Sequence, residues 1–297
     1  MKKKTFSAIS ALLCSFLWGT AFVAQDLGMD HIGPYTFNFS RLFIGSLFLL
    51  PFFLIFEFNK VKQVKFDLKK VLFLLIFLGI LLSSGQALQQ VSLLYTDVAN
   101  SAVFTVLYIL IVPIISFLFF SKKIHWSIWP AVFTSLIGTY FLSELDNLSV
   151  RFGDGLVILS AFCWAFQIIT WSKILQIFNF PITIAFFQCM FAAMFSCPTI
   201  FLEDPSINNV LKESYEILYV GIFSSGIAFL LQSYSLQNLS PAPAAIIYSL
   251  EGVFAAIFGW IILSQYLSMI KIFGIFLILA AVIFSQLSPT YGKKKYG

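Results

Sequence analysis

Hydrophobic positions in this 297-residue chain fall into ten long runs, separated by short polar segments. Each run holds about 18 to 25 mainly apolar residues, the length that an α-helix needs to cross a bilayer. The runs cover residues 6–28, 34–57, 71–93, 98–120, 126–143, 155–176, 181–202, 214–236, 241–263 and 268–287. The pattern therefore predicts an all-α polytopic membrane protein with ten transmembrane helices.

The second half of the chain repeats the punctuation of the first half. Pro34 and Pro51 enclose one apolar run, and Pro181 and Pro198 enclose another at the same spacing of 17 residues. Because proline interrupts or begins helices, matching proline pairs predict matching helix boundaries. The two halves are therefore interpreted as copies of one ancestral unit.

Tryptophans support the same alignment, because Trp18 and Trp164 occupy corresponding places in the first and sixth runs. Each copy holds five predicted helices, which is an odd number, so the second copy must lie upside down in the membrane. We expect two inverted five-helix repeats, at 1–145 and 150–290. Inverted repeats are typical of secondary transporters.

Composition agrees with a membrane protein and excludes a soluble one. The chain is 60% hydrophobic and 10% charged, with a mean hydropathy of +0.94, whereas soluble domains carry about 25% charged residues. The net charge of +5 does not predict nucleic-acid binding, because the lysines form short clusters between apolar runs. The four cysteines lie within apolar runs and form no CxxC pair, so we expect no metal site and no cofactor.

Lysine and arginine placement predicts the orientation of the helices. With a cytoplasmic N-terminus, 14 of the 18 Lys and Arg residues fall in cytoplasmic segments, while only Arg151, Lys212 and Lys271 fall outside. Positive residues accumulate on the cytoplasmic side. We expect a multi-pass protein of the cell (inner, cytoplasmic) membrane with both termini in the cytoplasm. The alternative, that the first run is a cleaved signal peptide, would leave nine helices.

Four short motifs stand out: Trp18-Gly19-Thr20, Pro34…Arg41…Pro51, Tyr108…Pro113 and Leu250-Glu251-Gly252-Val253. In these motifs the chain resembles the drug/metabolite transporter superfamily, in its ten-helix form built from two EamA domains. Gly252 replaces a proline that family members commonly carry, so the resemblance leaves the substrate and the coupling ion open.

Glu251 and Arg41 are the acidic and basic residues predicted deep within helices. A charge at the bilayer centre costs about 2.5–3.5 kcal/mol on insertion scales, so each must face the bundle interior, a partner or water. Glu251 is interpreted either as a proton-coupling or cation-binding carboxylate, or as a buried carboxyl that fixes packing. Arg41 either binds a substrate carboxylate or phosphate, or is a structural arginine near the outer interface. A direct Arg41–Glu251 pair is a third option.

Polar side chains recur at helical spacing in both copies. Gln86 and Gln90 share a helix face, as do Tyr248 and Glu251. Such rows either line a polar cavity or hydrogen-bond neighbouring helices, and their recurrence in both copies favours the cavity. The candidate substrate-binding residues are Trp18, Arg41, Gln86, Gln90, Tyr108, Trp164, Gln232, Tyr248 and Glu251.

The sequence favours a secondary transporter that moves a small polar or amphipathic metabolite by alternating access. The resemblance allows an amino acid, a nucleoside or base, or an adenylated cofactor such as S-adenosylmethionine. A channel-like passive facilitator and a multidrug or cation exporter remain alternatives. No cluster of catalytic groups points to an enzyme. The expected partners are the substrate, protons as the candidate coupling ion and the lipid bilayer, for a monomer or homodimer.

Overall fold

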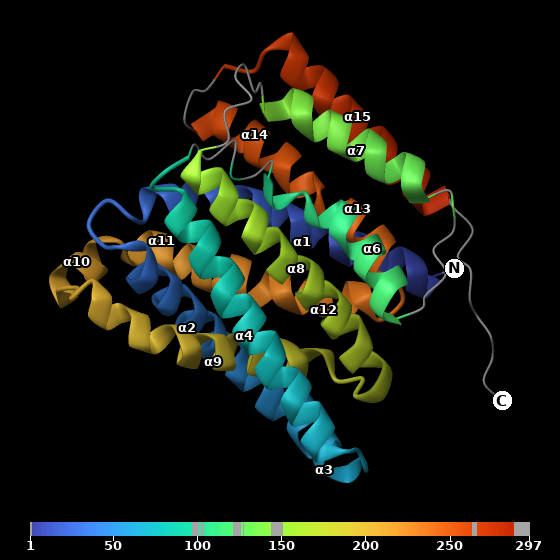
Figure 1. Ribbon diagram of the computed structural model, residues 1–297. Helices are drawn as coiled ribbons and strands as arrows, with labels where there is room; N and C mark the ends of the chain where they lie inside the picture. Colours follow the sequence, from blue (N-terminus) through green and yellow to red (C-terminus); the bar gives the residue numbers. More distant parts are fainter. Residues whose placement is uncertain are drawn as a thin grey trace.

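The computed structural model describes residues 2–96, 101, 104–120, 126, 128–143, 151–262 and 266–287, and every regular element in these ranges is helical (Figure 1). The long elements of the first half are α1 (Lys2–Leu27), α2 (Pro34–Phe52), α4 (Leu68–Ser92), α6 (Tyr108–Phe120) and α7 (Ile128–Ser143). Those of the second half are α8 (Phe152–Ile177), α9 (Pro181–Ser196), α12 (Ala228–Leu236), α13 (Pro241–Tyr248), α14 (Leu250–Ile262) and α15 (Met269–Leu287). Shorter elements are η1 (Phe53–Glu57), α3 (Phe58–Gln63), η2 (Cys197–Leu202), α10 (Ile207–Lys212), α11 (Ser214–Tyr219) and η3 (Val220–Ile227).

The predicted polytopic all-α membrane protein is confirmed. Eight helical segments are long and apolar enough to cross a bilayer, and the runs predicted at 98–120 and 126–143 form shorter apolar helices within the described residues. Residues 98–100 and 102–103 of the fourth predicted helix lie outside the described part of the chain. The eight segments are Lys3–Leu27, Pro34–Gln63, Leu68–Ser92, Phe152–Ile177, Pro181–Leu202, Ser214–Leu236, Pro241–Ile262 and Met269–Gln286.

The second proline of each pair marks a change in helix type rather than a helix end. Pro51 lies inside α2, and the π-helix η1 and then α3 carry the same segment on to Gln63, beyond the predicted end at residue 57. Pro198 lies in the 3₁₀-helix η2. Since proline lacks the N–H that bonds the carbonyl four residues earlier, the helix must rearrange around it.

The ninth predicted helix is also irregular. It is divided into α13 and α14 by a turn at Ser249, where the Gly252 N–H bonds the Ser249 carbonyl three residues earlier. Glu251 therefore lies in the first turn of α14 instead of in the middle of one continuous helix.

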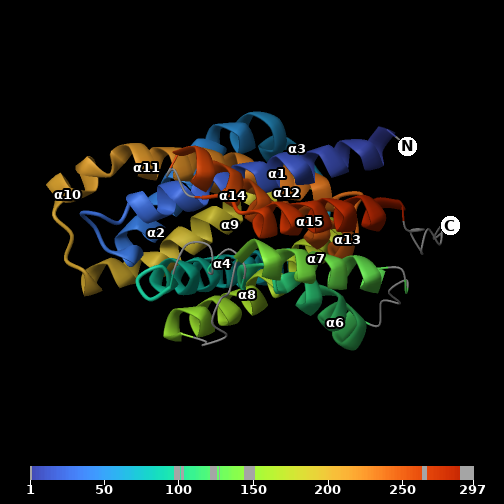
Figure 2. The same cartoon turned by 90° about the horizontal axis from the view of Figure 1, so that it is seen from above.

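Helices from the two halves pack in matching pairs. α1 packs against α12 and α14, and α8 packs against α4 and α6, while α2 contacts α9 and α7 contacts α15. Gly79 on α4 lies against Phe191 on α9, and Gly221 on η3 lies against Ile44 on α2. Figures 1 and 2 show α7 and α15 side by side along one edge of the bundle. Both views also place the start of α1 and the end of α15 at the same side of the molecule.

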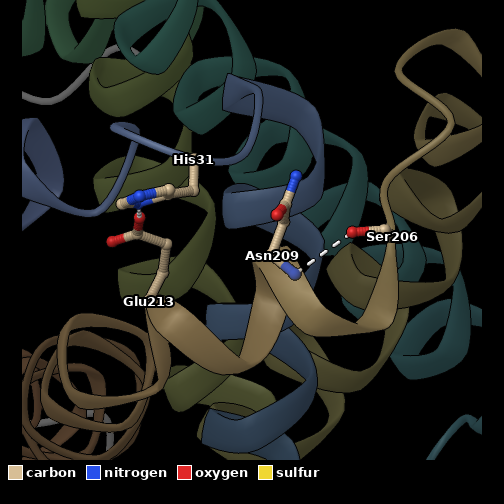
Figure 3. Close-up of polar contacts among 4 residues, drawn as sticks. All are labelled: His31, Ser206, Asn209 and Glu213. Atoms are coloured by element: carbon tan, nitrogen blue, oxygen red, sulfur yellow. Dashed lines mark hydrogen bonds and ion pairs between the residues drawn. The ribbon is translucent and has the colours of Figure 1, made fainter.

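Polar contacts tie together the connections at one end of the bundle, which we call the α10 end. His31, between α1 and α2, pairs with Glu213, between α10 and α11. The Ser206 side chain caps α10 by accepting the Asn209 N–H at 3.2 Å, as Figure 3 shows. These contacts hold the α1–α2 connection against the segment that precedes α11.

Candidate functional site

A cavity whose wall includes charged and amide side chains lies among α1, α2, α4, α8, η3, α12, α14 and the start of α6. It holds about 40 Å³ of free volume, which is room for a few water molecules. Seven of the nine predicted site residues line its wall: Trp18, Arg41, Gln86, Tyr108, Trp164, Gln232 and Glu251.

The other two predicted residues are buried outside this lining. Gln90 donates from Nε2 to the Gln25 carbonyl oxygen at 3.0 Å and thereby joins α4 to α1. Tyr248 hydrogen-bonds Ser235 and packs edge-to-face against Trp18, with ring centroids 5.5 Å apart. Both residues support neighbours of the cavity in this conformation.

Arg41 is 1% exposed and is held by neutral acceptors from three other elements. Its Nη1 donates to Gln25 Oε1 at 2.5 Å and to Gln86 Oε1 at 2.9 Å. Its Nε and Nη2 donate to the hydroxyls of Ser225 at 3.2 Å and Ser224 at 3.0 Å. These four bonds occupy four of the five guanidinium N–H groups and leave one on Nη2. No described carboxylate, Glu251 included, pairs with the charge.

The local structure of η3 makes this arrangement possible. Gly221 lets α2 approach closely, because a Cβ atom there would stand 2.7 Å from Cγ2 of Ile44. The π-helical turns then present Ser224 and Ser225 to the same guanidinium. π-helical turns of this kind are frequent at functional sites.

Glu251 supplies a carboxylate to the same cavity from the first turn of α14. It is 5% exposed, and its Oε1 accepts the Tyr108 hydroxyl at 3.0 Å. An acidic residue is stabilised at the N-terminal turn of a helix by the unpaired N–H groups there. One wall therefore carries a cation and another a carboxylate, with no ion pair between them.

Alignment of Pro34 with Pro181 places Gln188 opposite Arg41, and Gln188 belongs to a cluster of neutral amides. Gln188 on α9 is fully buried, and its Oε1 accepts Gln167 Nε2 at 3.1 Å. Gln167 on α8 also donates to Gln232 Oε1 on α12 at 2.9 Å. Besides the two serines of η3, the charged cluster uses α2, α1 and α4, and the amide cluster uses α9, α8 and α12, which align with them in the second half.

The two corresponding tryptophans differ in their hydrogen bonding. Trp18 Nε1 donates to the Ser224 carbonyl oxygen at 3.3 Å. Trp164 Nε1 is buried and has no hydrogen-bond partner among the described residues. Trp164 also lines the cavity.

Sequence reasoning missed Gln25, Gln167 and Ser224, which also line the cavity. Gln25 lies seven residues after Trp18, so helical spacing from the predicted tryptophan would have identified it. Ser224 had no comparable signal, because its position depends on the π-helical turns. In the described ranges, no three His, Cys, Asp or Glu side chains gather as a metal site.

Comparison with known proteins decides the family. The profile of the EamA-like transporter family matches residues 5–144 and again residues 151–287. The chain belongs to the EamA-like transporter family. This EamA-like protein is therefore a multi-pass membrane transporter and not an enzyme.

Relatives of this EamA-like transporter align along almost the whole chain. An uncharacterized transporter of Archaeoglobus fulgidus is 28% identical over 96% of this chain and 87% of its own length. The uncharacterized transporter YoaV of Bacillus subtilis is 24% identical over 99% of this chain and 100% of its own. One crystal structure shares the fold, with a TM-score of 0.79 at 15% identity, over 95% of this chain and 96% of that one.

Proposed function

We propose that this protein is a secondary transporter that moves a small zwitterionic metabolite across the cell membrane by alternating access. The observation that carries the proposal is the central cavity, whose walls hold one buried carboxylate and one buried arginine that has no acidic partner among the described residues. Charges at this depth are costly unless they serve a partner or a ligand.

An amino acid, or an adenylated cofactor that carries an amino-acid group, fits these charges better than an uncharged nucleoside or base. The remaining Nη2 hydrogen of Arg41 would bind the substrate carboxylate, because the guanidinium suits planar anions. Glu251 would bind the ammonium group. Trp18 and Phe229 pack edge-to-face beside the cavity, and such aromatic surfaces suit a planar or apolar substrate side chain. Trp164 would donate its N–H to an acceptor on the substrate.

Movement of the walls is part of the proposal, because about 40 Å³ cannot hold a metabolite. Small-molecule pockets usually reach about 300–1,000 Å³. The two halves, 1–145 and 150–290, would act as inverted five-helix repeats with ten spanning helices and would rock about the shared site. The matching helix pairs support this symmetry. The lysine distribution supports placement of both termini in the cytoplasm.

Glu251 is the proposed coupling group, which a proton would neutralise when no ammonium group is bound. A passive channel, the main alternative, would need a continuous polar path, whereas this cavity holds only about 40 Å³ and the aromatic rings of Trp18, Phe229 and Tyr248 pack against one another beside it. Glu251 would take up a proton on one side of the membrane and release it on the other, so its side chain would be neutral while the empty site changes its access.

Uptake into proteoliposomes tests the function. The purified protein would be screened with labelled amino acids and adenylated amino acids, with and without an imposed pH gradient. We expect saturable uptake that the gradient stimulates and that unlabelled substrate competes away. A flux that rises linearly with substrate concentration and does not change with the pH gradient would support the passive facilitator and contradict the carrier.

A further inference from the structure

A second hollow lies on the outer surface of the bundle, where α1, α11 and α14 meet. Its volume is about 340 Å³, and it shares no lining residue with the central cavity. We call it the α1–α11–α14 groove. Its walls include Val23 and Leu27 from α1, Tyr215 and Glu216 from α11, and Phe258 and Ile262 from α14.

The groove runs along α1 from the end of this helix towards its middle. Leu27 is the last residue of α1, and Thr20 lies seven residues earlier, ~10 Å along the helix. The Tyr219 hydroxyl donates to the Thr20 hydroxyl at 2.7 Å, so these polar groups already have partners. The remaining walls are mainly apolar, as an acyl chain requires.

Glu216 provides a charge in the wall of the groove. Its side chain is half-buried, and no hydrogen bond or ion pair joins it to another side chain in the described part of the chain. Its position in the first turn of α11 is electrostatically favourable for an acid. The favourable helix terminus does not explain why the Glu216 carboxylate lies in the wall of an apolar groove. Tyr215 beside it is 83% exposed, and exposed tyrosines at a helix end are typical of the membrane interface.

We propose that the α1–α11–α14 groove binds one phospholipid whose headgroup carries a primary ammonium, such as phosphatidylethanolamine. The ammonium donates hydrogen bonds to the Glu216 carboxylate, and one acyl chain lies along Val23, Leu27, Phe258 and Ile262. Charge complementarity selects this headgroup: phosphatidylglycerol has no cation, and the ammonium of phosphatidylcholine has no N–H to donate.

A bound lipid in the groove would contact the back of a helix that forms the central cavity. Thr20, Val23 and Leu27 face the groove, while Trp18 and Gln25 on the same helix face the cavity. The lipid therefore supports α1 from the membrane side. The lipid site is independent of the proposed substrate, and its test needs no transport assay.

Lipid binding would be measured on the full chain by native mass spectrometry and by thermal unfolding with added lipid. The lipids are phosphatidylethanolamine, phosphatidylcholine and phosphatidylglycerol with identical acyl chains. We expect one retained phosphatidylethanolamine and a higher unfolding temperature with that lipid only. Equal retention of all three lipids, or a preference for phosphatidylglycerol, would overturn the proposal.

Three variants separate the parts of the site. Glu216→Gln should remove the preference for phosphatidylethanolamine over phosphatidylcholine, and Ala24→Phe should fill the groove and reduce retention of every lipid. Asp204→Asn is the matched control, because it removes one negative charge from an exposed residue near the same end and asparagine tolerates its positive φ of 44°. The proposal fails if Glu216→Gln and Asp204→Asn retain lipids identically. If Ala24→Phe does not fold, the Glu216→Gln comparison alone decides.

Discussion

Thr36, in the first turn of α2, donates two hydrogen bonds to one carboxylate oxygen of Glu203, which lies just after η2. Glu203 Oε2 accepts the Thr36 N–H at 2.8 Å and its hydroxyl at 2.7 Å, while Oε1 accepts the Tyr35 N–H at 2.8 Å. The other end of the α2–α9 pair has the reciprocal contact. There Glu57 Oε2 accepts the N–H and the hydroxyl of Thr183, each at 2.7 Å. The segment that follows each of these two helices therefore caps the start of the other helix.

The reciprocal caps predict that Glu57→Gln and Glu203→Gln each lower stability. Hydrogen bonds to charged groups contribute about 1.5–3 kcal/mol, and an amide oxygen accepts more weakly than a carboxylate. We expect both variants to unfold at a lower temperature than the parent, with the larger loss for the more buried Glu57. Scanning fluorimetry in detergent measures this.

Asp67→Asn is the control for these caps. Asp67 caps α4 through one exposed bond to the Lys70 N–H at 3.1 Å, so its replacement should have a smaller effect. Unfolding of Glu57→Gln at the parental temperature would show that the cap does not stabilise the α2–α9 pair.

Arg41→Lys should impair binding of a substrate carboxylate although it keeps the charge. A lysine cannot reproduce the planar fork that holds Gln25, Gln86 and the two serines. Loss of one charged hydrogen bond to the substrate predicts an affinity about 10- to 100-fold weaker. Uptake measured over a range of concentrations should show a higher KM. An unchanged KM in a folded Arg41→Lys protein would assign Arg41 a structural role.

Glu251→Gln should abolish proton-driven transport while the protein stays folded. Glutamine is neutral at every pH, so it can neither take up nor release a proton, and it can still accept the Tyr108 hydroxyl. Tyr108→Phe removes that hydroxyl but keeps the carboxylate, and should retain a response to the pH gradient. Parental uptake with the parental pH dependence in Glu251→Gln would exclude the coupling role.

The two corresponding tryptophans should respond differently to replacement by phenylalanine. Trp18→Phe removes a bond to the Ser224 carbonyl and should lower stability by about 1 kcal/mol. Trp164→Phe removes an N–H that has no hydrogen-bond partner in the described part of the chain, so the stability should stay at the parental level while substrate affinity falls. Thermal unfolding and ligand-dependent tryptophan quenching measure the two effects. Equal affinity of Trp164→Phe and parent for the substrate would remove Trp164 from the site.

Much of this fold could be predicted from the sequence because hydrocarbon imposes a simple rule. Every backbone polar group in the membrane must be satisfied within the chain, so each long apolar run must be helical. The proline pairs then identified corresponding helices. The runs at 34–57 and 241–263 were less predictable, because Pro51 gives a π-helical turn and Ser249 divides α13 from α14.

Site residues could be predicted where a charge deep within a helix marked them. They could not be predicted where the packing of neighbouring helices determines which side chains reach the cavity. Arg41 and Glu251 stood out because charges are rare at that depth, and both line the cavity. Gln90 and Tyr248 share helix faces with lining residues, yet their side chains bond Gln25 and Ser235 instead. Residues on one face of a helix do not all reach the cavity. The packing of the neighbouring helices determines which of them do.

Gly19→Ala should disturb the site through the backbone. A Cβ at Gly19 would lie 2.6 Å from the Glu251 carbonyl oxygen, so α1 and α14 would have to separate at the level of the proposed coupling carboxylate. We expect lower stability and reduced transport, because backbone atoms cannot move aside as a flexible side chain does.

Gly155→Ala on α8 is the matched control for this prediction. A Cβ at Gly155 meets no atom within 4 Å, and alanine in a helix is favoured over glycine by about 0.5–1 kcal/mol. Gly155→Ala should therefore unfold at or above the parental temperature and transport normally. If Gly19→Ala matches Gly155→Ala in unfolding temperature and uptake rate, close contact between α1 and α14 is not required for Glu251 to function.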